Sequence, residues 1–404
     1  MPRLLSSSVR IVPSRWLRSV VCALVAISCR PAEPTTQVRR RTAGDTVYVE
    51  SPAQGVDGPM QLQIVRRINL AALDIGRVDA AAFGPLGTLW VFDGASDGGA
   101  AVHVLDSLGA PRALAGREGA GPGEYRAPIR MFRLADGSML IKEMHTTRAV
   151  RFDARGQALS TMELPPVVAS GWVVTPDTVG GWFITAVFED NTSARIGRFG
   201  WLHFDGRGVV TDTVHPPTFL LGEPTPDGIV PGRIKTVGRD GAVLTTTPGP
   251  NRLYRYARDG RTHVLAWPGT PPGYQPDERR DMQVVSDRMN ALFGMPPKAL
   301  PEHKEPSHRI LTDSAQWIWA QLAAEGVRIP DDELPKDPDN MGLTVRWRDR
   351  ERWAALDRDG ALRFVIDAPP NVTVVDRSTY RVLGIETDDE GVQSLVIWRV
   401  VPGR

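Results

Sequence analysis

Cysteine is nearly absent from this chain of 404 residues, since Cys22 and Cys29 are the only two. No cysteine follows residue 29, so a disulfide within residues 30–404 is excluded. The folded part must therefore be stabilised by its hydrophobic core, without a disulfide bond. Paired cysteine ligands of a structural zinc site are excluded for the same reason.

A long apolar segment and a strong net charge are also missing. The apolar run Val20–Ile27 is far shorter than the roughly 20 residues that a membrane-spanning helix needs. The formal net charge of +1 includes four arginines and no acid in residues 1–28, which leaves the remainder at −3. We therefore expect no nucleic-acid partner. Only five of the 48 basic residues are lysine, and we attribute this arginine excess to base composition before any phosphate-binding role.

The N-terminus has the pattern of an export signal. Arginines precede the apolar run, which has the length of the central region of a signal peptide, and Ser28 and Cys29 follow it. The stretch Ala26-Ile27-Ser28-Cys29 resembles the lipobox of bacterial lipoproteins, with Ala26 where leucine is usual. We predict a signal peptide over 1–28, a lipid (palmitate-type) modification on Cys29 and a flexible tether over 29–44. A secreted protein or an uncleaved membrane segment is the alternative.

Glycine and proline, 39 and 34 in number, are scattered along the chain, which is typical of many turns. One phrase recurs: two apolar strands around an Asp or Gly turn, then a third strand ending in Asp-x-x-Gly. Its clearest copy spans 132–156, where Asp136-Gly137 is a strong hairpin signal. The copies lie at 81–109, 132–156, 180–206, 238–260, 310–360 and 380–400.

Six copies at this spacing predict an all-β fold over 45–404, a single six-bladed β-propeller of four-stranded antiparallel blades. We expect the early strands Thr46–Val49 and Leu62–Val65 to complete the last blade and so remove exposed edges. Trp90, Trp182, Trp317 and Trp319 occupy strand positions, and we assign them to the core between blades before any sugar-binding surface.

One segment, Pro276–Phe293, has apolar residues at helical spacing and acidic residues at its start. We predict a helical insertion over 270–307 between blades four and five. It would cover the propeller's own surface, or else act as a lid or docking element.

A glycine-rich decapeptide, Gly116-Arg-Glu-Gly-Ala-Gly-Pro-Gly-Glu-Tyr125, cannot form a regular helix or strand. It resembles the signature of the bacterial six-bladed β-propeller lipoproteins, which are similar to NHL-repeat propellers. The resemblance covers about residues 45–400 and implies a propeller held at the cell envelope, without implying an activity. The exposed amides of such a loop can hold an anion. Arg117, Glu118, Glu124 and Tyr125 are thus candidate ligand-binding residues, and the alternative is a clamp between blades.

The sequence contains few motifs of catalysis, nucleotide binding or metal binding. The chain has no nucleotide-binding loop, no His-Glu-x-x-His and no Gly-x-Ser-x-Gly, although hydrolase side chains could still converge from different blades. Lactonase and gluconolactonase propellers look broadly similar and hold a divalent metal in the channel. By that resemblance Asp93, Glu143 and Asn251 are candidate ligands for Ca²⁺. The alternative is that such carboxylates cap turns.

These features favour a monomeric extracytoplasmic propeller, attached to a membrane by its N-terminal lipid. Facing the periplasm or cell exterior, it would bind a peptide, a glycan or an envelope protein. No catalytic residue is predicted and no cofactor is expected. Two alternatives stay open: a metal-dependent lactonase-like hydrolase, and a structural part of an envelope assembly.

Overall fold

The structure is a computed structural model that describes residues 37–94, 100–126, 128–143, 146–168, 174–188, 198–217, 234–247, 249–292, 296–331, 334 and 344–403. The predicted signal peptide and Cys29 lie outside the described residues.

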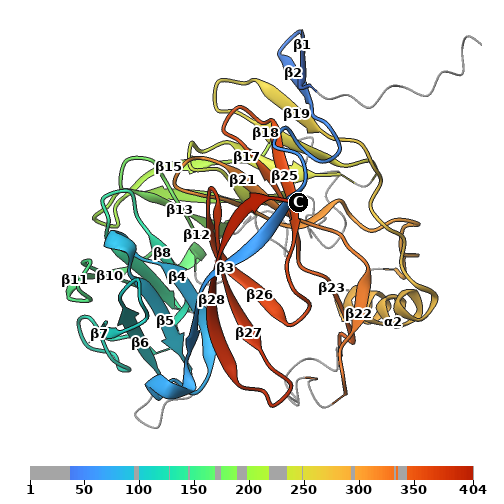
Figure 1. The fold of residues 1–404 in the computed structure, drawn as a ribbon. Coiled ribbons are helices and arrows are strands. Elements are labelled where there is room, and N and C mark those ends of the chain that lie inside the picture. Colours follow the sequence, from blue (N-terminus) through green and yellow to red (C-terminus); the bar gives the residue numbers. More distant parts are fainter. Residues whose placement is uncertain are drawn as a thin grey trace, which may run out of the picture.

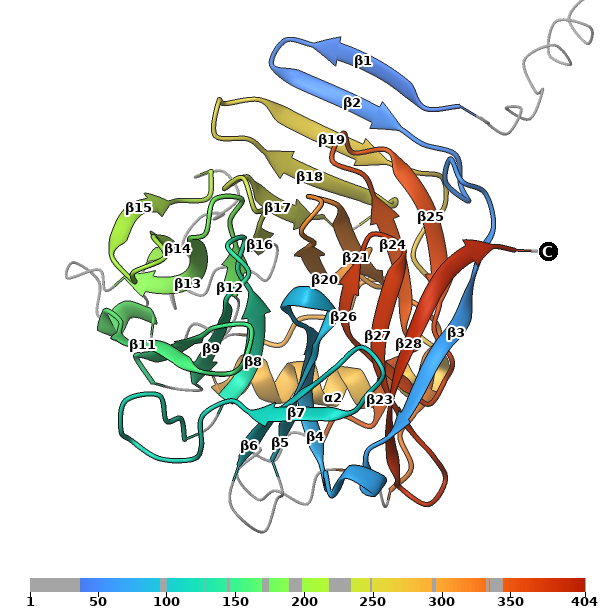
Figure 2. The ribbon, with the colours of Figure 1, turned by 60° about the vertical axis from the view of Figure 1, so that its left-hand side comes forward.

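Six antiparallel sheets arranged around a common centre form a six-bladed β-propeller, as predicted (Figures 1 and 2). Blades one to three consist of β4 (Val78–Phe83), β5 (Leu89–Asp93), β6 (Ala101–Leu105) and β7 (Pro111–Leu114); of β8 (Pro128–Arg133), β9 (Met139–Glu143), β10 (Arg148–Phe152) and β11 (Ala158–Glu163); and of β12 (Val174–Pro176), β13 (Trp182–Phe188), β14 (Arg198–Phe204) and β15 (Val210–Val214).

Blades four to six follow the same plan. They consist of β16 (Ile234–Val237), β17 (Val243–Thr246), β18 (Arg252–Tyr256) and β19 (Thr262–Ala266); of β20 (Ser307–Thr312), β21 (Ile318–Leu322), β24 (Arg352–Leu356) and β25 (Leu362–Asp367); and of β26 (Val372–Ser378), β27 (Arg381–Thr387), β28 (Gln393–Pro402) and β3 (Met60–Asn69). The first strand of each blade is innermost, and neighbouring first strands contact one another, as β4 does with β8 and β26.

Burial differs between strands of one blade. The second strands β5 and β9 are buried at every position, because a neighbouring blade packs on each of their faces. The outermost strands β7 and β11 are largely exposed, and their sequences are correspondingly polar. The apolar runs Leu89–Phe92 and Met139–Ile141 of these strands therefore follow from burial on both faces.

The core is divided among the interfaces between blades, each with its own apolar cluster. Trp90 lies in the cluster between blades one and two, and Trp182 in the next one. Trp319 is fully buried between blades five and six, where Trp317 packs half-buried. These tryptophans belong to the core, as predicted.

Aspartate fixes the turn between the third and fourth strands of a blade. The Asp153 carboxylate accepts hydrogen bonds from the amides of Arg155 and Gln157, at 2.8 and 2.9 Å. Gly156 completes the turn with φ +83°, a conformation that glycine adopts at little cost. The same capping recurs at Asp106, Asp205 and Asp357.

The ring closes through the N-terminal part of the chain. β3, which contains the predicted strand Leu62–Val65, pairs with β28 as the fourth strand of blade six. The other early strand behaves differently: β2 (Thr46–Glu50) pairs in parallel with β19 and extends blade four. This corrects the expectation for Thr46–Val49. β3 alone completes the four strands of blade six, and β2 lies instead along β19, where Val49 is buried in the apolar cluster between blades four and five.

β1 (Arg39–Ala43) pairs with β2 and makes blade four a six-stranded sheet. The segment 29–44, predicted as a tether, thus includes residues that form a strand.

The predicted helix is α2 (Pro276–Leu292), inserted between blades four and five. Its one buried residue is Glu278, and the predicted apolar face is only partly covered, with Leu292 exposed. Lys304 Nζ lies 2.5 Å from Glu278 Oε1, 2.6 Å from Asp349 Oδ1 and 2.9 Å from the Ala324 carbonyl oxygen. A buried ion cluster therefore fastens this helix to blade five.

A second insertion in blade five was not anticipated from the sequence. β22 (Gly326–Arg328) and β23 (Trp347–Asp349) form a hairpin between β21 and β24. Trp347 Nε1 donates to Asp281 Oδ2 of α2 at 2.8 Å, and Gln275 Nε2 donates to the Gly326 carbonyl at 2.9 Å. The two insertions pack together as one attachment beside the propeller.

Candidate functional site

The candidate residues of the glycine-rich loop are brought together, and they bond to one another and to backbone. Arg117 Nε donates to Glu124 Oε1 at 2.6 Å, while Glu124 Oε2 accepts from the Gly121 amide. Glu118 accepts from the Ala100 amide at 2.8 Å. These contacts occupy the side chains proposed for an anion or ligand.

Tyr125 is completely buried, and its hydroxyl accepts from the Val102 amide and donates to the Ala115 carbonyl, at 2.8 and 3.0 Å. Burial raises the pKa of Tyr125 to about 12. From blade two, Thr161 Oγ1 accepts from the Gly123 amide and Arg148 donates to the Ala120 carbonyl. The loop thus makes bonds to both blade one and blade two.

The candidate metal ligands come from three blades and each has local partners. Asp93 is buried and accepts from the amides of Gly76 and Arg77, both at 3.0 Å. Glu143 is buried with Oε1 3.5 Å from Arg148 Nε, and Asn251 contacts the Pro268 carbonyl. Among the described residues, no group of three or more His, Cys, Asp or Glu side chains is placed to hold a metal ion.

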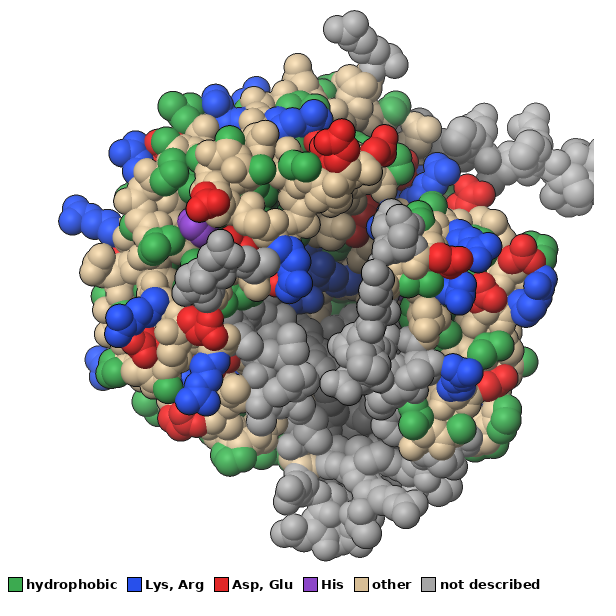
Figure 3. Space-filling model, turned by 90° about the horizontal axis from the view of Figure 1, so that it is seen from below, with side chains coloured by type: hydrophobic (Ala, Val, Ile, Leu, Met, Phe, Trp, Pro, Cys, Tyr) green, Lys and Arg blue, Asp and Glu red, His purple; other side chains and the backbone are tan. Residues whose placement is uncertain are grey.

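The cavity that the propeller builds lies at its centre, with a volume of about 610 Å³. Inner strands β4, β8, β12, β20 and β26 line it, and so do the turns that follow them. Pockets for small ligands commonly have volumes of this size. In the space-filling view of Figure 3, Lys and Arg side chains lie in and beside the hollow in the middle of the molecule.

Arginine dominates the polar lining of this cavity. Its five arginines are Arg130, Arg133, Arg239, Arg309 and Arg377. Arg377 is 7% exposed and stacks on the Trp353 ring, with its Cζ atom 4.2 Å from the ring centroid. Arg309 Nε and Arg377 Nη1 are buried without a hydrogen-bond partner in the part of the chain that the structure describes.

The electrostatics of these guanidinium groups are unfavourable. Burial, together with repulsion from Arg377 and Arg130, lowers the pKa of Arg309 to about 9. Burial also lowers the pKa of Arg377, to about 10, although Asp376 and Glu351 partly offset it. Burial alone accounts for the lowered pKa of Arg130. The charged state of each group is therefore disfavoured, and for Arg309 and Arg377 the nearby carboxylates offset this only in part.

Nearby carboxylates are committed to other donors. Asp376 accepts from the amides of Phe83 and Arg377, at 2.7 and 2.8 Å, and its burial raises its pKa. Glu351 accepts from Trp353 Nε1 at 2.7 Å, and burial raises its pKa as well. Neither carboxylate lies within ion-pair distance of Arg309 or Arg377 in the described structure, so the cations stay unpaired.

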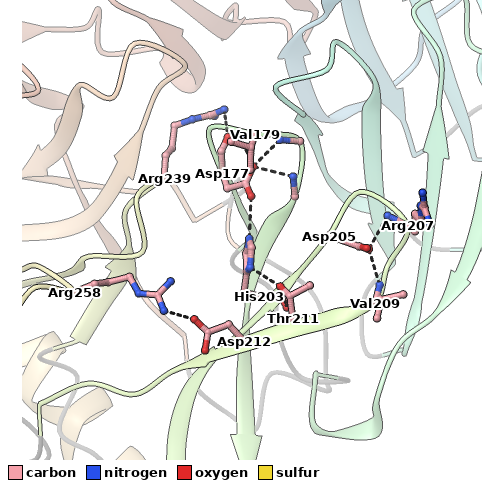
Figure 4. Close-up of polar contacts among 12 residues, drawn as sticks. Asp177, Val179, His203, Asp205, Arg207, Val209, Thr211, Asp212, Arg239 and Arg258 are labelled. Carbon is pink, nitrogen blue, oxygen red and sulfur yellow. Dashed lines mark hydrogen bonds and ion pairs between the residues drawn. The ribbon is translucent and has the colours of Figure 1, made fainter.

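Arg239 is held from outside the cavity by blade three. Its Nη2 donates to the Asp177 carbonyl oxygen at 2.5 Å, and the Asp177 carboxylate accepts from three amides of its own turn (Figure 4). His203 Nε2 lies 2.9 Å from Asp177 Oδ2 and its Nδ1 lies 2.7 Å from Thr211 Oγ1. Burial would raise the pKa of Asp177, but the bonds from His203 and the amides outweigh burial and lower it.

The row Thr211, His203, Asp177 has the order of a nucleophile, a base and an orienting acid. Thr211 is exposed on the outermost strand β15 and does not line the cavity. We therefore infer that Thr211, His203 and Asp177 position the turn whose carbonyl group binds Arg239.

A second cavity, of about 1080 Å³, lies beside the insertions and is lined by Tyr274, Lys304, Trp347 and Asp349 among others. Thr373 of β26 lines both cavities.

The arginines that line the central cavity were not predicted as site residues from the sequence. In the structure Arg130, Arg309 and Arg377 each stand in the first strand of a blade, but they lie one to three residues before the predicted copies that begin at 132, 310 and 380. The general arginine excess drew attention away from them.

Neither a protein-family model nor a curated protein matches the chain in sequence. Among solved structures, a DUF4221-family protein from Bacteroides vulgatus matches with a TM-score of 0.50 and 9% identity, over 86% of this chain and all of that one. A candidate exported protein from Bacteroides fragilis matches with a TM-score of 0.49 and 12% identity, over 89% of this chain and all of that one. Virginiamycin B lyase from Staphylococcus aureus matches with a TM-score of 0.38 and 13% identity, over 89% of this chain and 98% of that one. At such identities the likeness concerns the fold alone.

No helix among the described residues is long and apolar enough to cross a membrane.

Proposed function

We propose that this protein is a lipid-anchored, extracytoplasmic binding propeller that takes its ligand into the central cavity. The observation that carries this proposal is the cavity itself, which has the volume of a ligand pocket and buried N–H groups that find no acceptor among the described residues. Buried polar groups in folded proteins are normally satisfied, so these groups call for an acceptor from outside the chain.

The anchor is supported by the basic start, the short apolar run and Cys29 in the lipobox-like stretch. Nine residues, 30–38, separate Cys29 from β1, which allows a reach of up to about 35 Å between the lipid and the propeller. The propeller would then remain near one membrane surface while sampling the surrounding space.

Metabolic labelling with palmitate tests the anchor, and the chain offers a matched pair of cysteines. We expect label in the wild type and in Cys22→Ser, and none in Cys29→Ser. Equal labelling of Cys29→Ser would contradict lipid attachment at this residue.

Thermal melting of the full chain against a library of peptides, oligosaccharides and small acids tests the cavity. Thr373→Trp would obstruct the cavity, because Thr373 faces it from an inner strand. Asn371→Trp is the control, since Asn371 lines the second cavity, which Thr373 also lines, and does not line the central one. A ligand shift present in the wild type and the control but lost in Thr373→Trp supports the proposal. A shift that survives Thr373→Trp contradicts it.

A metal-dependent, lactonase-like hydrolase is the second candidate. In its favour, Glu143 Oε1 is buried and accepts no hydrogen bond from the described residues. Addition of Ca²⁺ should then raise the melting temperature of the wild type and leave that of Glu143→Gln unchanged. Identical melting with EDTA and with Ca²⁺ would exclude a bound calcium ion.

A further inference from the structure

We infer that the central cavity binds a small oxyanion with at least two negative charges, of the phosphate or polycarboxylate class, through Arg130, Arg309 and Arg377. This inference rests on the proposed function, because it names the chemistry of the ligand that the cavity would take.

The charges around the cavity do not balance. Among the described residues, five arginines line it, and Asp79, Asp313 and Asp376 are the acids of the same lining. Asp79 already pairs with Arg77, at 2.8 Å. Even when Glu351 is counted with Asp313 and Asp376, the arginines outnumber these carboxylates by two. A dianion would restore neutrality in a region where unpaired charge is strongly disfavoured.

The acids cannot take over this role by a small rearrangement. Asp313 caps its own turn through the amides of Ala315 and Trp317, and it also accepts from the Thr379 amide at 2.7 Å. Asp376 links two blades through the Phe83 amide. Turning either carboxylate toward an arginine would leave buried amides without acceptors.

The guanidinium groups are supplied by three separate blades. Arg130 comes from β8, Arg309 from β20 and Arg377 from β26, and all three line the central cavity. The Trp353 ring supports the Arg377 guanidinium from one face. A planar guanidinium presents paired N–H groups that match the spacing of oxygens in phosphate and carboxylate.

A ligand site of this kind weakens the free protein. Like charges held together in a buried cavity repel one another, and an anion that binds only the folded state removes that repulsion. Binding should therefore stabilise the fold strongly, and removal of one arginine should cost no stability when the anion is absent.

Melting and calorimetric titration of the full chain with pyrophosphate and citrate test this inference. Acetate and chloride at matched ionic strength control for general screening. We expect saturable stabilisation by pyrophosphate or citrate and none by acetate, and the two probes separate a phosphate ligand from a polycarboxylate. Stabilisation by all four salts alike would overturn the inference, because it would report ionic strength alone.

Arg309→Met removes one guanidinium, and Arg112→Met is the matched control, since Arg112 is an exposed arginine that pairs with Asp106. We expect Arg309→Met to weaken anion affinity about tenfold or more, and to melt at or above the wild-type temperature without ligand. Arg112→Met should keep the wild-type affinity. Arg309→Lys, which keeps a charge but loses the planar fork, should show intermediate affinity.

The outcomes separate this inference from the proposed function. If no anion binds, but an uncharged ligand binds and is lost in Thr373→Trp, the anion inference fails and the binding propeller stands. If neither kind of ligand binds in a manner that depends on Thr373, both fail. Anion binding that is equal in the wild type and Arg309→Met overturns the assignment to this cavity.

Discussion

Two buried cationic sites in this molecule have opposite surroundings. Lys304, beside α2, is within 2.6 Å of two carboxylate oxygens and 2.9 Å of a carbonyl, and these partners raise its pKa despite burial. Arg309, in the central cavity, has no such partner in the described structure, and its pKa falls to about 9. A buried cation that is satisfied holds the fold together, whereas an unsatisfied one indicates a place for an external ligand.

The largest effect expected from this comparison is on Lys304. Lys304→Met leaves Glu278 and Asp349 buried without their cation, so we expect the free energy of unfolding to fall by about 3–5 kcal/mol. Urea denaturation measures this loss, with Lys298→Met as the control because Lys298 is exposed. A loss no larger than that of the control would mean that the ion cluster does not hold the insertion.

A smaller effect concerns pH and Asp349. Bonds from His308, Lys304 and the Ala324 amide outweigh the effect of burial and lower the pKa of Asp349. A carboxyl group with a lowered pKa in the folded state stabilises the protein above its unfolded value of about 4, and this contribution is lost as the pH falls through the folded value.

Asp349→Asn should therefore be less stable than the wild type at pH 7, with a difference that shrinks toward pH 3. Urea denaturation across this range measures it. A difference that stays constant with pH would show that Asp349 stabilises the fold by packing and not by charge.

A third prediction concerns the glycine-rich loop, where polar groups are satisfied as they are around Lys304. Tyr125→Phe leaves the Val102 amide and the Ala115 carbonyl buried without the phenol hydroxyl, which should cost about 1–3 kcal/mol. Anion affinity should not change, because this loop does not line the cavity. Tyr254→Phe is the control, since its hydroxyl makes no hydrogen bond to the described residues, and calorimetric melting measures both.

The smallest effect is expected for Arg117, which is the conspicuous arginine of the loop. Its side chain is 82% exposed, and exposed ion pairs contribute little to stability. Arg117→Gln should melt at the wild-type temperature and keep the wild-type anion affinity. A loss of affinity here, with none in Arg309→Met, would move the site from the cavity to the loop.

Much of the fold could be predicted because its signals are local. Asp136-Gly137 and the Asp153 turn specify hairpins within a few residues, and the apolar run of β9 reports burial on both faces. The partner of Thr46–Val49 could not be predicted, because a strand's alternation does not say which free edge it will meet. The hairpin of β22 and β23 could not be predicted either, since each strand has only three residues and the sequence between them gives no strand pattern.

The candidate site was harder to predict than the fold. The loop residues Arg117 and Glu124 stand in a conspicuous motif, yet their geometry shows mutual pairing. Whether Arg309 lacks a partner depends on residues from several blades, so no local pattern reports it. Satisfaction of polar groups is a property of the assembled ring.

The closure of the ring by β3 has a consequence for the order of folding. β3 and its partner β28 stand more than 300 residues apart in the chain. β3 is therefore synthesised first in its blade and cannot pair until β28 has been made. Contacts of such long range slow folding, and an unpaired strand edge is prone to association during the delay. A chain that crosses a membrane N-terminus first would emerge with β3 exposed and become a closed disc only when its final residues arrive. Loss of those few residues should therefore leave five blades complete, the sixth without β28, and the circle open.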